Sequence, residues 1–317
     1  MNNQENRLGI AIPTKNRDSL LNITISSIIE SVRQINAQER VLIVISDNNS
    51  SDKTTNVVTR LSAQHRDIHF IYRKQPNDLD HDHNIAQVLK IAAGSGVDYV
   101  FTCGDDDIWE KDATSKILWA ILRNPGFIHA NFSRFSHTTG QCIDNRSVTK
   151  PQKSLFILGS EKTLNFPFGL GSLHRTMEAN AMNLSTIGLR ADLIREYLQE
   201  IPTKYWGLNI IHSFLFTKTL RQDRTAFFIA DPIIKYRVNP DSRWSNNVWQ
   251  AANHDLQEWK ALLGYSQLGI QMIKMIQAPY ESKPYFMGES FRSSERELFT
   301  WFYNCAVYNL WIKNKSE

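Results

Sequence analysis

Residues 98–107 read DYVFTCGDDD, an apolar run that ends in three consecutive aspartates. A short apolar run closed by a turn is typical of a buried β-strand. Adjacent carboxylates raise one another's pKa unless a positive charge lies among them. Mg²⁺ or Mn²⁺ suits this position, because these ions take one or two carboxylates and complete their shell with phosphates and water. We therefore predict metal binding by Asp105, Asp106 and Asp107, with a solvated acidic turn or a helix start as the alternative.

Strands and helices are predicted to alternate before this motif. The apolar runs predict strands over residues 8–13 (LGIAIP), 40–46 (RVLIVIS), 69–72 (HFIY) and 98–103. Apolar residues at helical spacing predict helices that begin near residues 18 and 54, and a third over residues 84–93. This alternation indicates an α/β fold with a mostly parallel sheet covered by helices.

Polar clusters follow three of these strands, at residues 14–17, 47–49 and 105–107. The carboxyl ends of parallel strands meet at one edge of a sheet, where ligands of such folds bind. We therefore expect one site at this edge. The GxGxxG and GxxxxGK[ST] signatures are absent from the chain, so the site is neither a dinucleotide fingerprint nor a P-loop.

The chain resembles the family 2 glycosyltransferases, which have a GT-A fold. The matching segments are PTKNR at 13–17, SDNNSSDKT at 46–54, Asn84 and GDDDIWEKD at 104–112. Order and spacing agree over residues 8–115, and more weakly to about residue 245. The family often has two acids where this chain has Asp47 and Asn48, and an acid where it has Gly104.

The resemblance implies a GT-A fold and the transfer of a sugar from a nucleotide-diphospho-sugar donor, most commonly UDP-linked. Apolar spacing, not the resemblance, predicts additional C-terminal helices over residues 255–277 and 295–312. It implies Mn²⁺ or Mg²⁺ on the diphosphate, with Asp106 as the main ligand and Asp105 facing the ribose or the metal. The remaining donor-binding residues that it implies are Pro13, Thr14, Asn16 and Arg17 at the nucleoside, Asp47 at the base, and Asn84 near the ribose or diphosphate.

An inverting transferase needs a general base for the acceptor hydroxyl. The family usually places an acid at the start of a helix where this chain has residues 209–212, NIIH. No acid lies between Glu200 and Asp223, so His212 is the side chain there that suits a base near neutral pH. The chain is similar here to O-antigen-type, abequosyltransferase-like sequences. A core or capping histidine is the alternative, and a retaining reaction would need no such base.

The rest of the second half gives weaker predictions. Strands are expected over residues 127–135, 155–158, 181–189, 225–231 and 232–238, with a helix over 190–198 and a loop over 166–173. The resemblance places Arg237 and Arg243 at a loop that closes over the diphosphate; both also suit a plain surface. Trp206 and Trp244 could stack on sugars or simply pack, and His254 is a weak candidate metal ligand.

Charge and hydropathy bound the location and the partners. Residues 1–110 carry 11 Lys+Arg and 15 Asp+Glu, a net charge of −4, whereas residues 111–250 carry 18 and 10, a net charge of +8. A basic middle suits an anionic ligand or a membrane surface, or is a solvated face. The sequence has no Lys/Arg cluster of the kind that binds nucleic acid, so we do not expect a nucleic-acid partner. No apolar run would span a bilayer, and residues 1–7 lack a signal-peptide core, so we expect a cytoplasmic protein.

We expect a nucleotide-sugar-binding half at 1–110, an acceptor-binding half at 111–250 and a helical extension at 251–317. The extension ends in an aromatic helix, residues 295–312, flanked by basic residues, which suits a buried core, a homo-oligomer contact or a membrane surface. The acceptor we predict is a glycan, such as a lipid-linked bacterial polysaccharide intermediate. Two other functions stay open: a non-catalytic nucleotide-sugar or glycan-binding module, and a metal-dependent nucleotidyltransferase.

Overall fold

The computed structural model describes residues 6–136, 141–144, 155–157, 184–201 and 226–238, and the single positions Trp206, Ile211, His212, Leu215 and Thr219. The chain divides into two compact units, Met1–His174 with Asn183–Asn239, and Arg175–Met182 with Pro240–Glu317. Every described residue belongs to the first unit. The loop expected at 166–173 and the C-terminal helices lie outside the described residues.

The first half of the sheet is parallel. Strands β1 (Leu8–Thr14), β2 (Val41–Asp47), β3 (His69–Lys74) and β4 (Tyr99–Thr102) lie in the order β3-β2-β1-β4. The four predicted strands are thus confirmed to within about two residues. All residues of β1 and β2 are buried, which is why both read as unbroken apolar runs.

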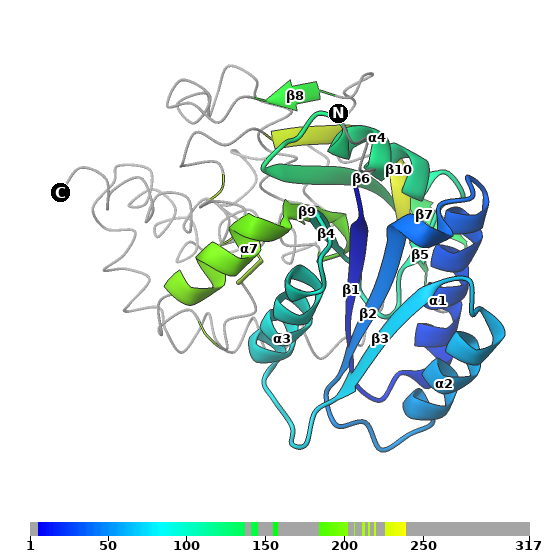
Figure 1. Ribbon diagram of the computed structural model, residues 1–317. Coiled ribbons are helices and arrows are strands. Elements are labelled where there is room, and N and C mark those ends of the chain that lie inside the picture. The colour runs from blue at the N-terminus through cyan, green and yellow to red at the C-terminus, as the bar shows by residue number, and fades with distance from the viewer. Residues whose placement is uncertain are drawn as a thin grey trace, which may run out of the picture. The chain divides into compact units, whose positions relative to one another are not determined.

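Helices cover both faces of this half (Figure 1). Helix α1 (Asp18–Arg33) packs against α2 (Thr54–Gln64) on one face, and α3 (His81–Gly94) packs against β1 and β2 on the other, beside α7 (Ala191–Tyr197). The predicted inner face of α1 is confirmed, since Leu21, Ile25, Ile28, Ile29 and Val32 are all buried. The structure therefore has the predicted α/β layering.

The second half of the sheet is mixed. β9 (Ile187–Arg190) runs antiparallel between β4 and β6 (Phe127–Ser136), and β10 (Ala226–Val238) runs parallel to β6. The short strand β5 (Ile108–Trp109) closes the order β4-β9-β6-β10-β5. Two further short strands, β7 (Cys142–Asp144) and β8 (Leu155–Ile157), pair with β6 and β10. The remaining described elements are α4 (Ala113–Ile121) and the 3-10 turns η1 (Gln38–Arg40), η2 (Leu184–Thr186) and η3 (Leu198–Glu200).

Three predicted strands differ from the structure. The two strands expected over 225–238 form one strand, β10, whose register with β6 shifts around Pro232 because proline cannot donate a ladder hydrogen bond. The strand expected from residue 181 begins only at Ile187, after the turn η2. At Gly188 of β9 an added Cβ would lie 2.9 Å from Phe101, so any larger residue there would force the Phe101 ring or the strand to shift.

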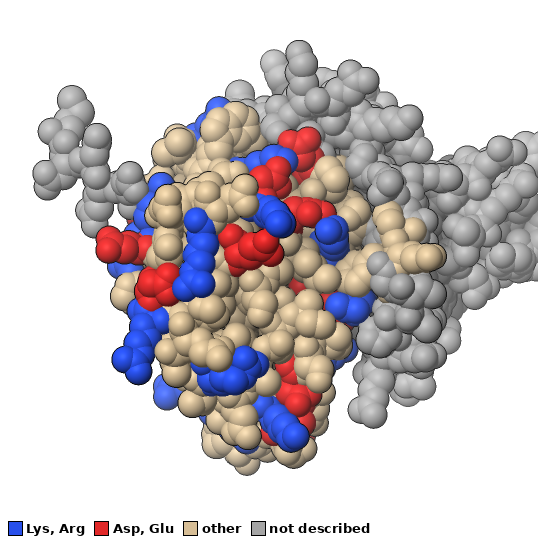
Figure 2. All heavy atoms as spheres, turned by 90° about the vertical axis from the view of Figure 1, so that its right-hand side faces the viewer, with Lys and Arg blue, Asp and Glu red and all other residues tan. Residues whose placement is uncertain are grey.

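Charges of both signs are intermixed on the face that Figure 2 shows, which is the right-hand side of Figure 1. Exposed side chains of opposite charge also pair, as in Arg33–Asp67 and Lys111–Glu30. The negative net charge of residues 1–110 is therefore not gathered into one patch on this face. None of the helices that the structure describes is long and apolar enough to cross a membrane.

Candidate functional site

The aspartate run lies at the carboxyl edge of the sheet, between β4 and β5. Two polar residues of α1 form hydrogen bonds with the backbone of this segment. Thr24 Oγ1 donates to the Asp107 carbonyl at 2.8 Å, and Ser27 Oγ accepts from the Trp109 amide at 3.0 Å. The indole of Trp109 donates to Cys103 Sγ at 3.2 Å. Helix α1 thus fixes the backbone on which the carboxylates are mounted.

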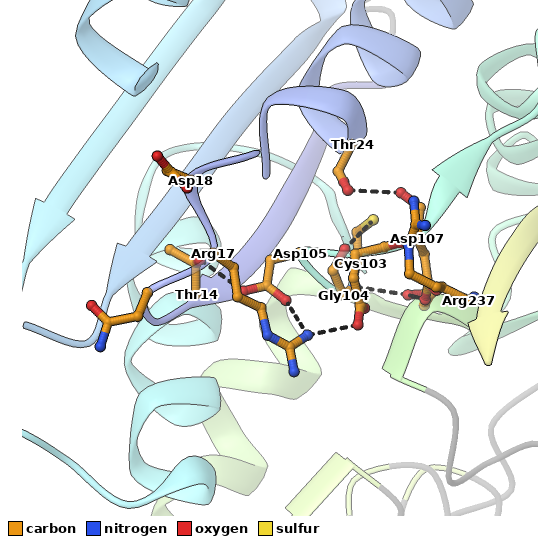
Figure 3. Close-up of polar contacts among 12 residues, drawn as sticks. Thr14, Arg17, Asp18, Thr24, Cys103, Gly104, Asp105, Asp107 and Arg237 are labelled. Carbon is orange, nitrogen blue, oxygen red and sulfur yellow. Dashed lines mark hydrogen bonds and ion pairs between the residues drawn. The ribbon is translucent and has the colours of Figure 1, made fainter. Parts of the chain in front are cut away.

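Asp105 is buried and points toward the loop that follows β1 (Figure 3). Thr14 Oγ1 donates to its Oδ2 at 2.7 Å, and Arg17 Nη1 lies 3.1 Å from its Oδ1. Burial raises the pKa of Asp105, while the positive charge of Arg17 opposes that rise. The resemblance grouped Thr14, Arg17 and Asp105 in one site, and the structure brings their side chains into contact.

Asp106 shares the same guanidinium nitrogen. Its Oδ2 lies 2.6 Å from Arg17 Nη1, and its side chain is 22% exposed against 10% for Asp105. Arg237 Nε donates to its backbone carbonyl at 2.8 Å. Asp106 is therefore the carboxylate of this pair that is more open to a ligand.

Asp107 turns the other way. Ser185 Oγ donates to its Oδ2, and the Arg237 amide donates to its Oδ1 at 2.8 Å. Burial, followed by the negative charge of Asp106, raises the pKa of Asp107. Both oxygens thus have partners within the protein, and Asp107 joins the run to η2 and β10. Its assignment as a metal ligand stays a prediction.

The fit of a divalent cation can be judged from these contacts. Among the described residues, no group of three or more His, Cys, Asp or Glu side chains surrounds one point. Asp105 Oδ1 and Asp106 Oδ2 nevertheless converge on one positive nitrogen of Arg17, which stands in for a cation. Two carboxylates completed by donor phosphates are enough for Mg²⁺ or Mn²⁺. The pair therefore fits the metal that the aspartates predict.

Packing explains why a glycine stands at position 104, which the sequence did not reveal. An added Cβ would lie 3.2 Å from both Asp107 Oδ2 and Ser185 Oγ. The Gly104 amide also donates to Ser185 Oγ at 2.7 Å. An acid at this position, as the family often has, would have to displace this buried hydrogen-bonded group.

Asn16 connects the β1–α1 loop to the loop after β2. Its backbone is in the left-handed region, with φ of 53°, which asparagine tolerates better than most residues. The Asn16 amide donates to Ser50 Oγ and the Ser51 amide donates to Asn16 Oδ1, both at 2.8 Å. Pro13 lies within β1, paired with Ser46. Asn16 therefore links the two loops by hydrogen bonds next to Arg17.

Asp47 is fully buried at the end of β2. The Ser50 amide donates to its Oδ1 at 2.8 Å, and the Tyr72 hydroxyl donates to its Oδ2. Burial, followed by this hydrogen bond, raises the pKa of Tyr72 to about 12. Both carboxylate oxygens of Asp47 thus order the loop itself, and its contact with a base stays a prediction.

Asn48 and Asn84 also make well-defined contacts. The Asn48 amide pairs with the backbone of Leu79, donating to its carbonyl at 2.8 Å and accepting from its amide at 2.7 Å. Asn84 is buried and accepts from Ser46 Oγ at 2.7 Å, which ties α3 to β2. These two asparagines hold the loop before α3 and the start of that helix against the sheet edge.

The structure describes His212 as a buried residue. The preceding amide, of Ile211, lies 3.4 Å from Oδ1 of Asp82, which is fully buried in the first turn of α3. This contact brings the segment of His212 to the α3 side of the sheet edge. Its role as a base stays a prediction. Arg243, Trp244 and His254 lie outside the described residues.

Several residues near the site escaped the sequence reasoning. Ser185 links Gly104 to Asp107 from 78 residues along the chain, and no local pattern could reveal it. His81 lies close enough to Arg17 for burial and that charge to lower its pKa. The ring of His83 stacks on Trp206 with centroids 4.2 Å apart. The HDH run at 81–83, directly before Asn84, was the available signal for the last two.

Comparisons with known proteins identify the family and the fold. The family model described as "Glycosyl transferase family 2" matches residues 9–178. S. aureus TarS 1-349 aligns with a TM-score of 0.54 at 12% identity, covering 85% of this chain and 78% of that one. The same protein solved with UDP-GlcNAc also aligns with a TM-score of 0.54 at 12% identity, covering 94% of this chain and 79% of its own.

A further similar structure is the mannosyltransferase PcManGT from Pyrobaculum calidifontis, solved with GDP-Man and Mn²⁺. It has a TM-score of 0.53 at 17% identity and covers 84% of this chain and 67% of its own. At these identities the likenesses establish a shared fold. A search of curated protein sequences finds no match to the chain.

Proposed function

Because the chain belongs to glycosyl transferase family 2, and is a glycosyltransferase with the GT-A fold, we propose that Asp105 and Asp106 hold Mn²⁺ or Mg²⁺ for a nucleotide-diphospho-sugar donor. A divalent cation at these residues would neutralise the diphosphate as it leaves. The observation that carries this proposal is the convergence of the two carboxylates on one positive charge, at the carboxyl edge of a parallel sheet.

The donor class is supported by two similar structures, one solved with UDP-GlcNAc and one with GDP-Man and Mn²⁺. These donors differ in both base and sugar. UDP is our first choice of base for this chain. Pro13, Thr14, Asn16, Asp47 and Asn84 are proposed to shape the nucleoside side of the site, with Asp47 acting through the loop that it orders.

The chain's own residues supply the remaining chemistry. His212 is proposed to take the proton of the acceptor hydroxyl, and its buried position at the α3 side of the edge would keep water from that step. Arg237 already contacts the backbone of the aspartate run through its Nε. Together with Arg243 it is proposed to neutralise diphosphate charge.

We further propose that the acceptor is a glycan, of the kind found on lipid-linked bacterial polysaccharide intermediates such as O-antigen. The basic segment 111–250 and the aromatic segment 295–312 support a peripheral position on the inner face of the cell membrane. In this proposal residues 1–110 bind the donor, 111–250 bind the acceptor, and 251–317 form an extension that contacts the membrane or a second copy.

A thermal-shift screen of nucleoside diphosphates and nucleotide sugars, each with and without Mn²⁺, tests the donor site. A ligand at 100 times its Kd stabilises the folded chain by about 2.7 kcal/mol, so the matching pair should raise Tm clearly. Asp106→Asn should abolish the part of the shift that needs Mn²⁺. Asp112→Asn, a nearby exposed carboxylate that pairs with Lys116, should retain it. An unaltered Mn²⁺ response in Asp106→Asn would refute the metal assignment.

Turnover separates the transferase from the alternatives. We expect the matching nucleotide sugar to release nucleoside diphosphate when an acceptor glycan is added, and His212→Ala to lose that release while still binding the donor. Donor binding without transfer to any of a broad panel of glycans would favour a binding module. Pyrophosphate release from a nucleoside triphosphate would favour a nucleotidyltransferase.

A further inference from the structure

Arg17 occupies the position between Asp105 and Asp106 with a single guanidinium nitrogen, and Figure 3 shows this side chain beside Asp105. Its Nη1 lies 2.6 Å from Asp106 Oδ2 and 3.1 Å from Asp105 Oδ1. The negative charge of Asp105 raises the pKa of Arg17, so the guanidinium stays positive. The side chain is 39% exposed, so it can move without unpacking the core. A divalent cation would need the place that this nitrogen holds.

The carboxylate of Asp105 and the backbone of Asp106 have other anchors, and the guanidinium of Arg17 has none in the described part of the chain. Asp105 is held by Thr14, and the backbone of Asp106 is held by Arg237. Among the described residues, the guanidinium of Arg17 makes hydrogen bonds to these two aspartates only, and all of them pass through Nη1. If Arg17 turned away, Asp105 and the backbone of Asp106 would keep their positions. Arg17 is therefore the exchangeable member of the cluster.

The backbone of Arg17 limits where its side chain can go. Its carbonyl accepts from the Leu21 amide at 2.8 Å, which fixes the residue at the start of α1. A displaced guanidinium thus stays at the same sheet edge. Arginine binds phosphate oxygens through two parallel hydrogen bonds, so a diphosphate held by the metal offers it a better-matched partner than solvent.

We propose that Arg17 exchanges with the metal: it pairs with Asp105 and Asp106 without donor, and binds the donor diphosphate once a cation replaces it. This inference rests on the proposed donor site. In this exchange the Arg17 side chain weakens the binding of metal alone, because both need the same two carboxylates. It strengthens the binding of metal and nucleotide together, because it then contacts the diphosphate. Metal and nucleotide must therefore bind cooperatively, each strengthening the other by the same factor.

The test measures Mn²⁺ and nucleotide affinities directly and needs no turnover. Free Mn²⁺ is followed by its electron paramagnetic resonance signal, with and without UDP, or with the nucleoside diphosphate that gives the largest shift in the thermal screen. Arg17→Gln should bind Mn²⁺ alone about tenfold more tightly than the wild type, and bind the nucleotide with Mn²⁺ about tenfold more weakly; each change equals about 1.4 kcal/mol.

Two variants control for charge and for general damage. Arg17→Lys keeps the positive charge and should keep the weak binding of Mn²⁺ alone. Arg33→Gln removes an arginine from the last turn of the same helix, where it pairs with Asp67, and should change neither affinity. Circular dichroism and Tm verify that each variant is folded. A purely structural role for Arg17 would weaken both affinities together.

Each outcome supports or overturns the exchange. Opposite changes of the two affinities in Arg17→Gln support it; parallel loss, or no change in the affinity for Mn²⁺ alone, overturns it. If Arg17→Gln does not fold, the same two affinities are measured in Arg17→Met, where opposite changes support the exchange and parallel loss or no change overturns it. Independent binding of Mn²⁺ and nucleotide in the wild type overturns it as well. Cooperative binding that Arg17→Gln leaves intact refutes the inference alone. Nucleotide binding that never depends on Mn²⁺ refutes the metal proposal as well.

Discussion

Replacing Thr14 with valine removes one hydrogen bond from the aspartate run and keeps the shape of the side chain. Thr14 Oγ1 donates to Asp105 Oδ2 at 2.7 Å, and both residues are buried. Valine also suits a strand, so β1 should tolerate it. A hydrogen bond to a charged group contributes roughly 1.5–3 kcal/mol, and its loss leaves a carboxylate oxygen without a partner. We expect Thr14→Val to lower the free energy of unfolding by about 2 kcal/mol.

The matched control is Thr24→Val. Thr24 is also buried and also donates to the aspartate run, but its acceptor is the neutral backbone carbonyl of Asp107. A neutral hydrogen bond contributes about 1 kcal/mol. At roughly 2–4 °C per kcal/mol for a domain of this size, Tm should fall by about 4–8 °C in Thr14→Val and by about 2–4 °C in Thr24→Val.

The pH dependence gives the sharper test. The hydrogen bond from Thr14 lowers the pKa of Asp105, so its removal raises that pKa further above the unfolded value. A raised carboxyl pKa favours the folded state at low pH, and that stability is lost as pH rises through the folded pKa. Thermal unfolding from pH 5 to 8.5 should therefore show the deficit of Thr14→Val growing with pH, while that of Thr24→Val stays constant. Equal, pH-independent deficits would refute the view that Thr14 stabilises an ionised Asp105.

Two further predictions concern packing and charge. Gly188→Ala should lower the free energy of unfolding by about 1–3 kcal/mol, because the new Cβ would meet Phe101. Gly94→Ala is the control: its Cβ would meet nothing within 4 Å, so the change should be neutral or stabilising. Similar denaturant midpoints for the two variants would contradict the tight strand contact. Burial raises the pKa of Asp107, so wild-type stability should fall, relative to Asp107→Asn, as pH rises from 5 to 9; unfolding curves that keep a constant difference would contradict this environment.

The parallel half of the fold was predictable because its strands are buried on both faces. β1 and β2 consist entirely of buried residues, so each reads as an apolar run that only a central strand explains. β5 was not predictable, since it has two residues and its existence depends on pairing with β10, more than a hundred residues later. α4 also escaped the sequence reasoning, although six of its nine residues are buried.

The sequence predicted that the loops meet at one edge of the sheet. It did not predict which of the three aspartates point outward and which points inward. Parallel pairing of β1 with β2 and β4 is enough to bring Thr14 near the run. Which carboxylate points outward depends instead on Ser185 and Arg237, which reach Asp107 from 78 and 130 residues away. Local sequence carries no signal for such contacts, and only the family resemblance distinguished Asp106, as the expected main metal ligand, from its neighbours.

The inward turn of Asp107 determines the charge that a cation meets. With Asp107 engaged by Ser185 and the Arg237 amide, two carboxylates face Arg17, which leaves a net charge of about −1 with the guanidinium in place and neutrality with one divalent cation instead. A third outward carboxylate would leave an unbalanced negative charge facing the donor diphosphate. Gly104 permits this arrangement, because its missing side chain leaves the space in which Ser185 and Asp107 meet. In the proposed metal site, Gly104 thus leaves room for Asp107 to turn inward, so that two carboxylates remain for the cation.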